Sequence, residues 1–172
     1  MTDPTPATVT ANGLALGDTL PELTIQTTLG EVSLQAYRGH QLVVYFYPKD
    51  DTPGCTVEGI DFTRLHPAFL AAGTQILGVS RDTLSSHQKF CNKHALSIAL
   101  ASDPDESLCR AFGVIKTKNM YGKMVQGIER STFLFDAQGV LRHAWRGVKV
   151  PGHAEAVLSQ AQSLAKSSAG HL

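Results

Sequence analysis

The sequence predicts an α/β fold in which helices flank a mixed central β-sheet. Several short runs are continuously apolar and rich in β-branched and aromatic residues, which is typical of strands buried on both faces. Segments with apolar residues at helical spacing lie between these runs. A turn at 136–139 precedes a final alternating segment, so an antiparallel strand should close the sheet. Parallel and antiparallel strands together predict the mixed sheet.

The expected strands follow from these patterns in chain order. Alternating segments on either side of Leu29-Gly30 predict an N-terminal hairpin. The run QLVVYFY predicts a central strand, and TQILGVS and STFLF are similar, whereas the run that begins at Ile98 is weaker. The predicted strands are 23–27, 31–34, 41–47, 74–80, 98–101, 131–135 and 140–145.

Four helices are expected between and after the strands. The first, 56–72, carries Phe62, Leu65 and Phe69 at helical spacing, and Pro67 should kink or restart it. The second, 83–94, begins at a Thr or Asp cap and contains no breaker. The remaining two are 106–112 and 154–165. Periodicity alone does not distinguish among the mixed α/β topologies that these elements could form.

Length and composition favour one globular domain over 13–172, preceded by a loose polar leader at 1–12. Hydrophobic residues make up 42% and charged residues 17%, and the formal net charge is zero. A balanced charge argues against nucleic acid or an anionic membrane as the partner. No apolar run reaches the roughly 18 to 20 residues of a membrane span, and 1–12 lacks the features of an export signal. A cytoplasmic, reducing location is therefore expected, with the three cysteines as thiols.

Cys55 occupies the most informative position in the chain, within the segment FYPKDDTPGCTVE. A buried strand ends before Pro48, and Pro53 and Gly54 shape the turn into the next helix. Unpaired N–H groups and the helix dipole at a helix start favour a thiolate, the reactive form of cysteine. Thr52 could place a hydroxyl beside the sulfur to orient a substrate. The alternative is that Cys55 is a small buried apolar residue.

This segment resembles the active-site motif of the peroxiredoxins, Pro-x-x-x-Thr-x-x-Cys, with Pro48, Thr52 and Cys55 at the three fixed positions. The longer string is similar to the bacterioferritin comigratory protein, or PrxQ, branch of that family. Further matches are GVS-x-D from Gly78, FGV from Phe112, ERSTFLFD and KV-x-GH, so the resemblance covers about 16–158.

The resemblance implies a thioredoxin-like fold and a peroxidase that reduces hydrogen peroxide or organic hydroperoxides. Cys55 would be the attacking residue, assisted by Thr52 and by Arg130, which stands at the position of the family's catalytic arginine. A fixed guanidinium beside the sulfur would stabilise both the thiolate and the departing oxygen. Pro48, Phe46 and Glu58 would line the substrate pocket, although a carboxylate such as Glu58 could equally be a solvated residue on the helix face.

The resemblance also implies a second cysteine that converts the sulfenic acid of Cys55 into a disulfide. Many members carry it five residues later, but that position is Ile60 here. Other members carry it on the following helix, where Cys91 stands. A disulfide needs Cα atoms about 4.4 to 6.8 Å apart, so we expect local unwinding near Cys55 and of the 83–94 helix. Cys109, in an apolar segment, is expected in the core.

A thioredoxin-like reductant and a monomeric state are further implications of the resemblance. We expect no cofactor, because the electrons arrive through a thiol. We also expect no metal, because the histidines and cysteines show no zinc-ligand spacing. Two alternatives stay open: a one-cysteine peroxidase regenerated by an external thiol, and a redox-sensing interaction protein that passes oxidation to a partner.

Overall fold

The structure, a computed structural model, describes residues 13–169, so the predicted leader at 1–12 lies outside the described residues. Nine strands and five helical segments follow one another along this part of the chain. The strands are β1 (Thr24–Thr27), β2 (Gly30–Ser33), β3 (Gln41–Phe46), β4 (Thr74–Ser80), β5 (Ala99–Ser102), β6 (Ile115–Met120), β7 (Lys123–Ile128), β8 (Ser131–Phe135) and β9 (Leu141–Arg146). The helices are the short 3₁₀ helix η1 (Leu34–Tyr37), α1 (Pro53–Ala71), α2 (Leu84–His94), α3 (Ser107–Ala111) and α4 (His153–Ala169).

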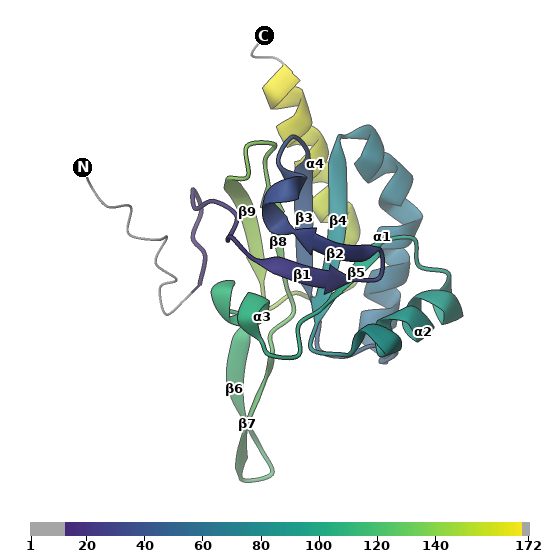
Figure 1. The fold of residues 1–172 in the computed structure, drawn as a ribbon, viewed down its shortest axis with the longest axis vertical. Helices are drawn as coiled ribbons and strands as arrows, with labels where there is room; N and C mark the ends of the chain where they lie inside the picture. The colour runs from purple at the N-terminus through teal and green to yellow at the C-terminus, as the bar shows by residue number, and fades with distance from the viewer. Residues whose placement is uncertain (1–12, 170–172) are drawn as a thin grey trace, which may run out of the picture.

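Seven of these strands form the central sheet in the order β2-β1-β5-β4-β3-β8-β9 (Figure 1). β3, β4 and β5 run parallel, while β8 and β9 on one side and β1 and β2 on the other pair antiparallel. The predicted mixed sheet with flanking helices is therefore confirmed.

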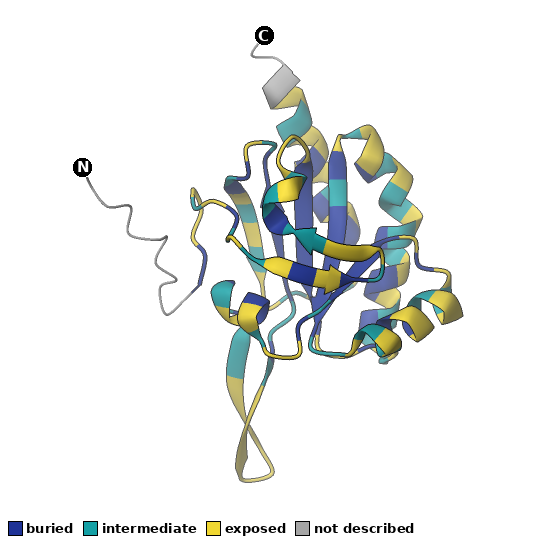
Figure 2. Ribbon diagram, viewed as in Figure 1, coloured by how far each residue is buried: buried dark blue, intermediate teal, exposed yellow. Residues whose placement is uncertain are grey.

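Alternate residues of the β3 segment enter two separate core clusters, because successive strand side chains point to opposite faces of a sheet. Leu42, Val44 and Phe46 belong to one cluster, together with residues of η1 and α3. Val43 and Tyr45 belong to the other, together with residues of α1, α2 and α4. The central strands are almost entirely buried and the helices expose their outer faces (Figure 2). Helices thus cover both faces of the sheet.

α1 does not restart at Pro67, which was one of the two outcomes expected from the sequence. The helix runs without a break from Pro53 to Ala71, with Pro67 inside it. Pro67 lies on the exposed side of the helix. Water can therefore satisfy the carbonyl that loses its helical partner there, which makes the proline tolerable.

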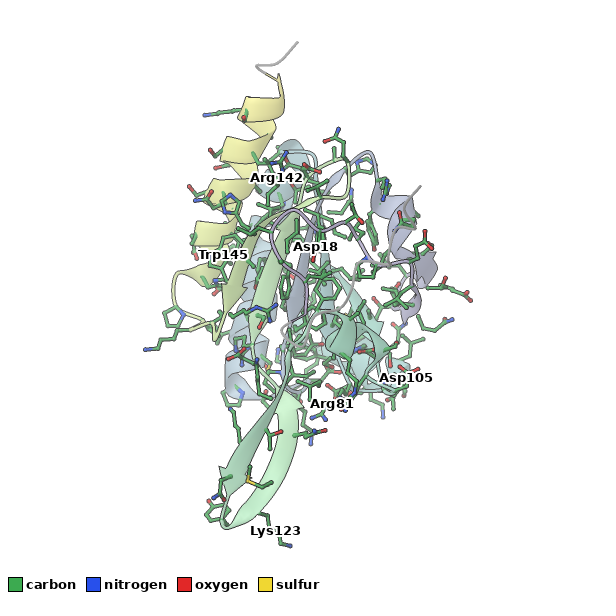
Figure 3. The ribbon with its side chains drawn as sticks, turned by 90° about the vertical axis from the view of Figure 1, so that its left-hand side faces the viewer. Asp18, Arg81, Asp105, Lys123, Arg142 and Trp145 are labelled. Carbon is green, nitrogen blue, oxygen red and sulfur yellow. The ribbon has the colours of Figure 1, made fainter. Side chains whose placement is uncertain are left out.

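The hairpin of β6 and β7 was not predicted from the sequence. It forms a separate two-stranded sheet that extends away from the body of the molecule, with Lys123 near its far end (Figure 3). Most of its residues are exposed on both faces. Within 13–169, none of the helices combines the length and the apolar character needed to cross a membrane.

Candidate active site

The start of α1 places Cys55 in the first turn of a long helix. Thr52 is the N-cap residue with an extended backbone, and Pro53 takes the first helical position, where its missing N–H costs no helical hydrogen bond. Cys55 is therefore the third residue of the helix, where the backbone N–H has no carbonyl one turn earlier to bind. The positive end of the helix dipole thus lies at the sulfur.

Thr52 stands beside this turn but does not use its hydroxyl to cap the helix. The hydroxyl donates to the carbonyl of Lys49 at 2.8 Å, rather than bonding to Cys55. Because its hydrogen is engaged in that bond, the lone pairs of the oxygen remain able to accept a hydrogen bond from another molecule.

Arg130, in the residue pair between β7 and β8, reaches across to α1 and contacts two of its side chains. Nη2 lies 3.4 Å from Cys55 Sγ, and Nη1 donates to Glu58 Oε1 at 2.6 Å. Burial by itself would favour a neutral guanidine, but the negative charges of Glu58 and Cys55 outweigh it and raise the pKa of Arg130. A permanent cation is therefore fixed against the cysteine sulfur.

Glu58 lies one helical turn after Cys55 and is 1% exposed, so it is not a solvated residue of the helix face. Burial raises the pKa of its carboxyl to about 7, although the charge of Arg130 acts in the opposite direction. Its second oxygen, Oε2, has no hydrogen-bond partner among the described residues. Glu58 therefore carries a carboxyl that gains or loses its proton near neutral pH, directly behind the arginine.

Gly54 makes room for this arginine. A Cβ atom at position 54 would lie 3.2 Å from Arg130 Nη2, which is closer than most such contacts in proteins. A larger residue would therefore push the guanidinium away from the sulfur by a few tenths of an ångström. Glycine at position 54 therefore leaves the space that Arg130 needs to contact the sulfur.

The two remaining cysteines differ in their surroundings. Cys91, on α2, is half-buried and packs against the core cluster that contains Cys55, and both are free thiols. Burial, followed by the negative charge of Asp50, raises the pKa of Cys91. Cys109, on α3, is fully buried in the opposite cluster, as expected, and burial strongly raises its pKa.

Of the residues predicted to line the pocket, Phe46 lies on the other face of the sheet, whereas the place of Pro48 in the pocket stays a prediction. Phe46 is completely buried in the core cluster on the other face of the sheet, where it packs against Phe112 and Phe133. Its side chain points away from Cys55 because it alternates with Tyr45 and Tyr47 along the strand. Pro48 is exposed in the loop that follows β3.

Two buried histidines near the site were not recognised from the sequence. His153, at the start of α4, makes a 2.8 Å hydrogen bond with Thr132. Its burial, and then the nearby charge of Arg130, lowers its pKa to about 4, so it is neutral at neutral pH. His87 lies within α2 and contacts Asp50 of the loop before Cys55. His153 is the last residue of the matched KV-x-GH string, which gave it no role, and His87 is a lone histidine in a helical segment, which has no characteristic pattern.

Comparisons with known proteins agree with this geometry. The family model described as the AhpC/TSA family matches residues 16–144. Peroxiredoxin Bcp of Xanthomonas campestris pv. campestris is 60% identical over 136 residues, which make up 79% of this chain and 85% of the relative.

Solved structures from Xanthomonas campestris are also similar. One, from work on the alkyl peroxide reduction activity of its bacterioferritin comigratory protein, has a TM-score of 0.81 and 56% identity, covering 83% of this chain and 92% of that chain. A cysteine-to-serine mutant of its peroxiredoxin Q has a TM-score of 0.83 and 53% identity, covering 91% of this chain and 99% of that chain. A second serine mutant of that protein alters another cysteine. The two altered cysteines are as far apart in that sequence as Cys55 and Cys91 are in this one.

Proposed function

We propose that Cys55 is the peroxide-attacking residue of this protein. The chain belongs to the AhpC/TSA family, in its Bcp/PrxQ peroxiredoxin branch, and is a peroxidase with a thioredoxin-like fold. One observation carries the proposal: Cys55 Sγ lies in the first turn of α1, 3.4 Å from Arg130 Nη2. The helix dipole and the guanidinium both stabilise negative charge on that sulfur.

The reaction begins when the Cys55 thiolate attacks the terminal oxygen of the peroxide. An S–O bond forms, the O–O bond breaks, and the departing oxygen takes up a proton, which leaves Cys55 as a sulfenic acid and releases water or an alcohol. Arg130 stabilises the negative charge that moves from the sulfur to the departing oxygen. Glu58 holds Arg130 in place through its 2.6 Å hydrogen bond.

Thr52 orients the peroxide in this proposal. Its hydroxyl hydrogen is occupied by the Lys49 carbonyl, so its oxygen accepts a hydrogen bond from the peroxide O–H. This arrangement holds the O–O bond in line with the attacking sulfur, which lowers the entropic part of the barrier.

Both hydrogen peroxide and organic hydroperoxides suit this chemistry. The proposed contacts of Cys55, Thr52 and Arg130 are with the two peroxide oxygens, and none of them requires a particular organic group. The alkyl peroxide reduction activity studied in the Xanthomonas campestris relative supports the inclusion of organic substrates.

Cys91 is the residue that we assign to resolution of the sulfenic acid. Its thiolate attacks the sulfur of oxidised Cys55, so that an S–S bond forms and the S–O bond breaks, and the departing hydroxide takes up a proton from solvent to become water. The matched cysteine separation in the relative and the shared core cluster support this assignment. Because the two cysteines lie on different helices and a disulfide needs Cα atoms about 4.4 to 6.8 Å apart, α2 opens during resolution in this proposal.

A thioredoxin-like protein dithiol then reduces the disulfide in our proposal, and the chain acts as a monomer in the cytoplasm. The balanced net charge is consistent with a protein partner rather than nucleic acid.

Serine variants of the two cysteines test the cycle. Cys55→Ser should abolish peroxide consumption, measured with a thioredoxin system that reports NADPH oxidation. Cys91→Ser should still consume one equivalent of peroxide in a single turnover, but should lose thioredoxin-dependent turnover. Retained consumption by Cys55→Ser would refute the role of Cys55. Full thioredoxin-dependent turnover by Cys91→Ser would favour the one-cysteine peroxidase instead.

A further inference from the structure

A buried group of polar side chains joins the loop before α1 to helix α2. Asp50, in that loop, accepts hydrogen bonds from His87 Nδ1 at 2.7 Å, from the Ser86 hydroxyl at 2.8 Å and from the Tyr47 hydroxyl at 2.6 Å. The other ring nitrogen of His87, Nε2, lies 2.8 Å from the carbonyl oxygen of Ala101 on β5. His87 thus ties three parts of the molecule together.

The partners of His87 determine where its protons are. A carbonyl oxygen can only accept, so Nε2 must carry a hydrogen to bond with Ala101. Burial opposes a charge on Asp50, but the hydrogen bonds from His87 and Tyr47 outweigh it and hold the pKa of Asp50 below its usual value. Asp50 is therefore ionised and Nδ1 also donates, so His87 and Asp50 form a buried ion pair.

The same arrangement argues against a metal at this position. Asp50, Asp82 and His87 bring possible ligand atoms within 4.8 Å of one another. Both ring nitrogens of His87 are engaged, however, Nδ1 with Asp50 and Nε2 with Ala101, so a cation would have to displace one of these hydrogen bonds. The carboxylates are also satisfied, because Asp82 accepts from the backbone N–H of Asp50 and from Ser80.

The ion pair lies between the two segments that carry the reactive cysteines. Asp50 precedes Cys55 by five residues, and His87 precedes Cys91 by four residues, or one helical turn. A cleft of about 330 Å³ lies between the loop and α2, lined by Asp50 and by Phe90 among other residues. The Asp50 carboxylate that binds His87 therefore lies at the edge of this cleft, where the loop and α2 meet.

Asp51, the next residue, provides a second link of a different kind. Its carboxylate contacts Lys93 at 2.8 Å and His94 at 3.0 Å, but its side chain is 46% exposed. Exposed ion pairs of this type contribute little, because water competes for both partners. The side chains of Asp50 and His87 are 4% and 0% exposed, so removing the charge of either partner is far more costly.

We propose that the Asp50–His87 ion pair restrains α2 against the Cys55 loop and thereby sets how fast Cys91 reaches the oxidised Cys55. The two residues are positioning residues, since neither contacts the reacting sulfur atoms. When α2 opens, the pair must separate, and the buried hydrogen bonds that Asp50 accepts from His87 and Ser86 are lost to water, which adds to the free energy of opening. The link to resolution rests on the proposed role of Cys91.

Asp50→Asn is the variant that tests the restraint with the least disturbance. The amide has nearly the same shape, its oxygen can still accept from Tyr47, and its NH₂ can donate to a neutral His87 and to Ser86. The variant therefore loses the charge while its buried partners stay satisfied. Asp51→Asn is the matched control, because Asp51 has a left-handed backbone (φ 60°) that asparagine also tolerates.

Hydrogen exchange of the reduced proteins measures opening without any peroxide chemistry. We expect the α2 amides of Asp50→Asn to exchange at least about tenfold faster than wild type, with α4 amides unchanged and Asp51→Asn within about twofold. Ser86→Ala removes one of the bonds to Asp50 on a partly exposed turn, and should show a smaller change in the same direction. Equal α2 exchange in the Asp50 and Asp51 variants would overturn the proposal, as would acceleration spread equally over α2 and α4. If Asp50→Asn does not fold, unchanged α2 exchange in Ser86→Ala overturns it.

Rapid-quench mapping of thiols then connects opening to resolution. After one equivalent of peroxide, Asp50→Asn should form the Cys55–Cys91 disulfide faster by a similar factor, and excess peroxide should yield less sulfinic acid. Faster exchange with an unchanged disulfide rate would overturn the link to resolution. If wild type forms no such disulfide, the proposed role of Cys91 fails, whereas the exchange result still decides whether the ion pair restrains α2.

Discussion

Replacing Glu58 with glutamine should remove a component of the protein's stability that depends on pH. In the folded protein burial raises the pKa of this carboxyl to about 7, compared with 4.5 for an exposed glutamate. Between these values the folded protein keeps a proton that the unfolded chain has released. The stabilising contribution is thus fully present below pH 4.5 and is lost as the pH rises to about 7. A tenfold difference in proton affinity between the folded and unfolded protein corresponds to about 1.4 kcal/mol. The pKa values of 4.5 and about 7 differ by more than two such factors of ten, so the free energy of unfolding loses about 3 kcal/mol over this pH range.

Glutamine cannot ionise, but its oxygen can still accept the hydrogen bond from Arg130. We therefore expect the free energy of unfolding of Glu58→Gln, relative to wild type, to rise by about 3 kcal/mol between pH 4.5 and 7, as measured by urea denaturation under reducing conditions. Glu155→Gln is the control: Glu155 also pairs with an arginine, Arg64, but it is exposed and that bond lowers its pKa. The free energy of unfolding of Glu155→Gln, relative to wild type, should change only slightly over the same pH range, and it should fall rather than rise. A difference for Glu58→Gln that does not change with pH would refute the reasoning.

Four further substitutions give expected outcomes in the rate of Cys55 oxidation, measured by stopped flow, or in stability. Arg130→Lys should slow oxidation by about 10²-fold or more, because an ammonium cannot bridge Glu58 and the sulfur together; a change below threefold would contradict this. Thr52→Val should slow it by about tenfold without loss of stability, since the hydroxyl does not cap α1; wild-type rates would exclude the orienting role. Gly54→Ala should also cost roughly tenfold by displacing Arg130, and an unchanged rate would show that the guanidinium does not need its present position. Cys109→Ser should lower stability by about 1–3 kcal/mol, because it buries a hydroxyl in the core, while the oxidation rate stays the same; a slower rate would place Cys109 in the reaction.

The central sheet and the start of α1 could be predicted from the sequence because their signals are local. β3, β4 and β8 are buried on both faces and therefore appear as continuous apolar runs. Pro53 and Gly54 were predicted as the turn before a helix at 56–72, and α1 in fact begins at Pro53, because proline fits the first position of a helix. The motif around Cys55 pointed to Thr52 and Arg130, which the structure places at the start of α1 and beside the sulfur.

The errors and omissions arise where the deciding interaction is not local. A strand that is apolar at every position does not reveal which residues face which core, so Phe46 was assigned to the wrong side of the sheet. The β6–β7 hairpin is exposed on both faces and has no periodic pattern to detect. Glu58 is buried against Arg130, which is distant in sequence, and the Asp50–His87 pair likewise joins residues that only the fold brings together.

The most direct test of the proposed cycle is to oxidise the reduced protein with one equivalent of hydrogen peroxide and map its cysteines by mass spectrometry without reduction. We expect a disulfide between Cys55 and Cys91, with Cys109 left as a free thiol. Cys55 present as sulfenic or sulfinic acid, with Cys91 unmodified, would contradict the intramolecular cycle and leave a one-cysteine peroxidase.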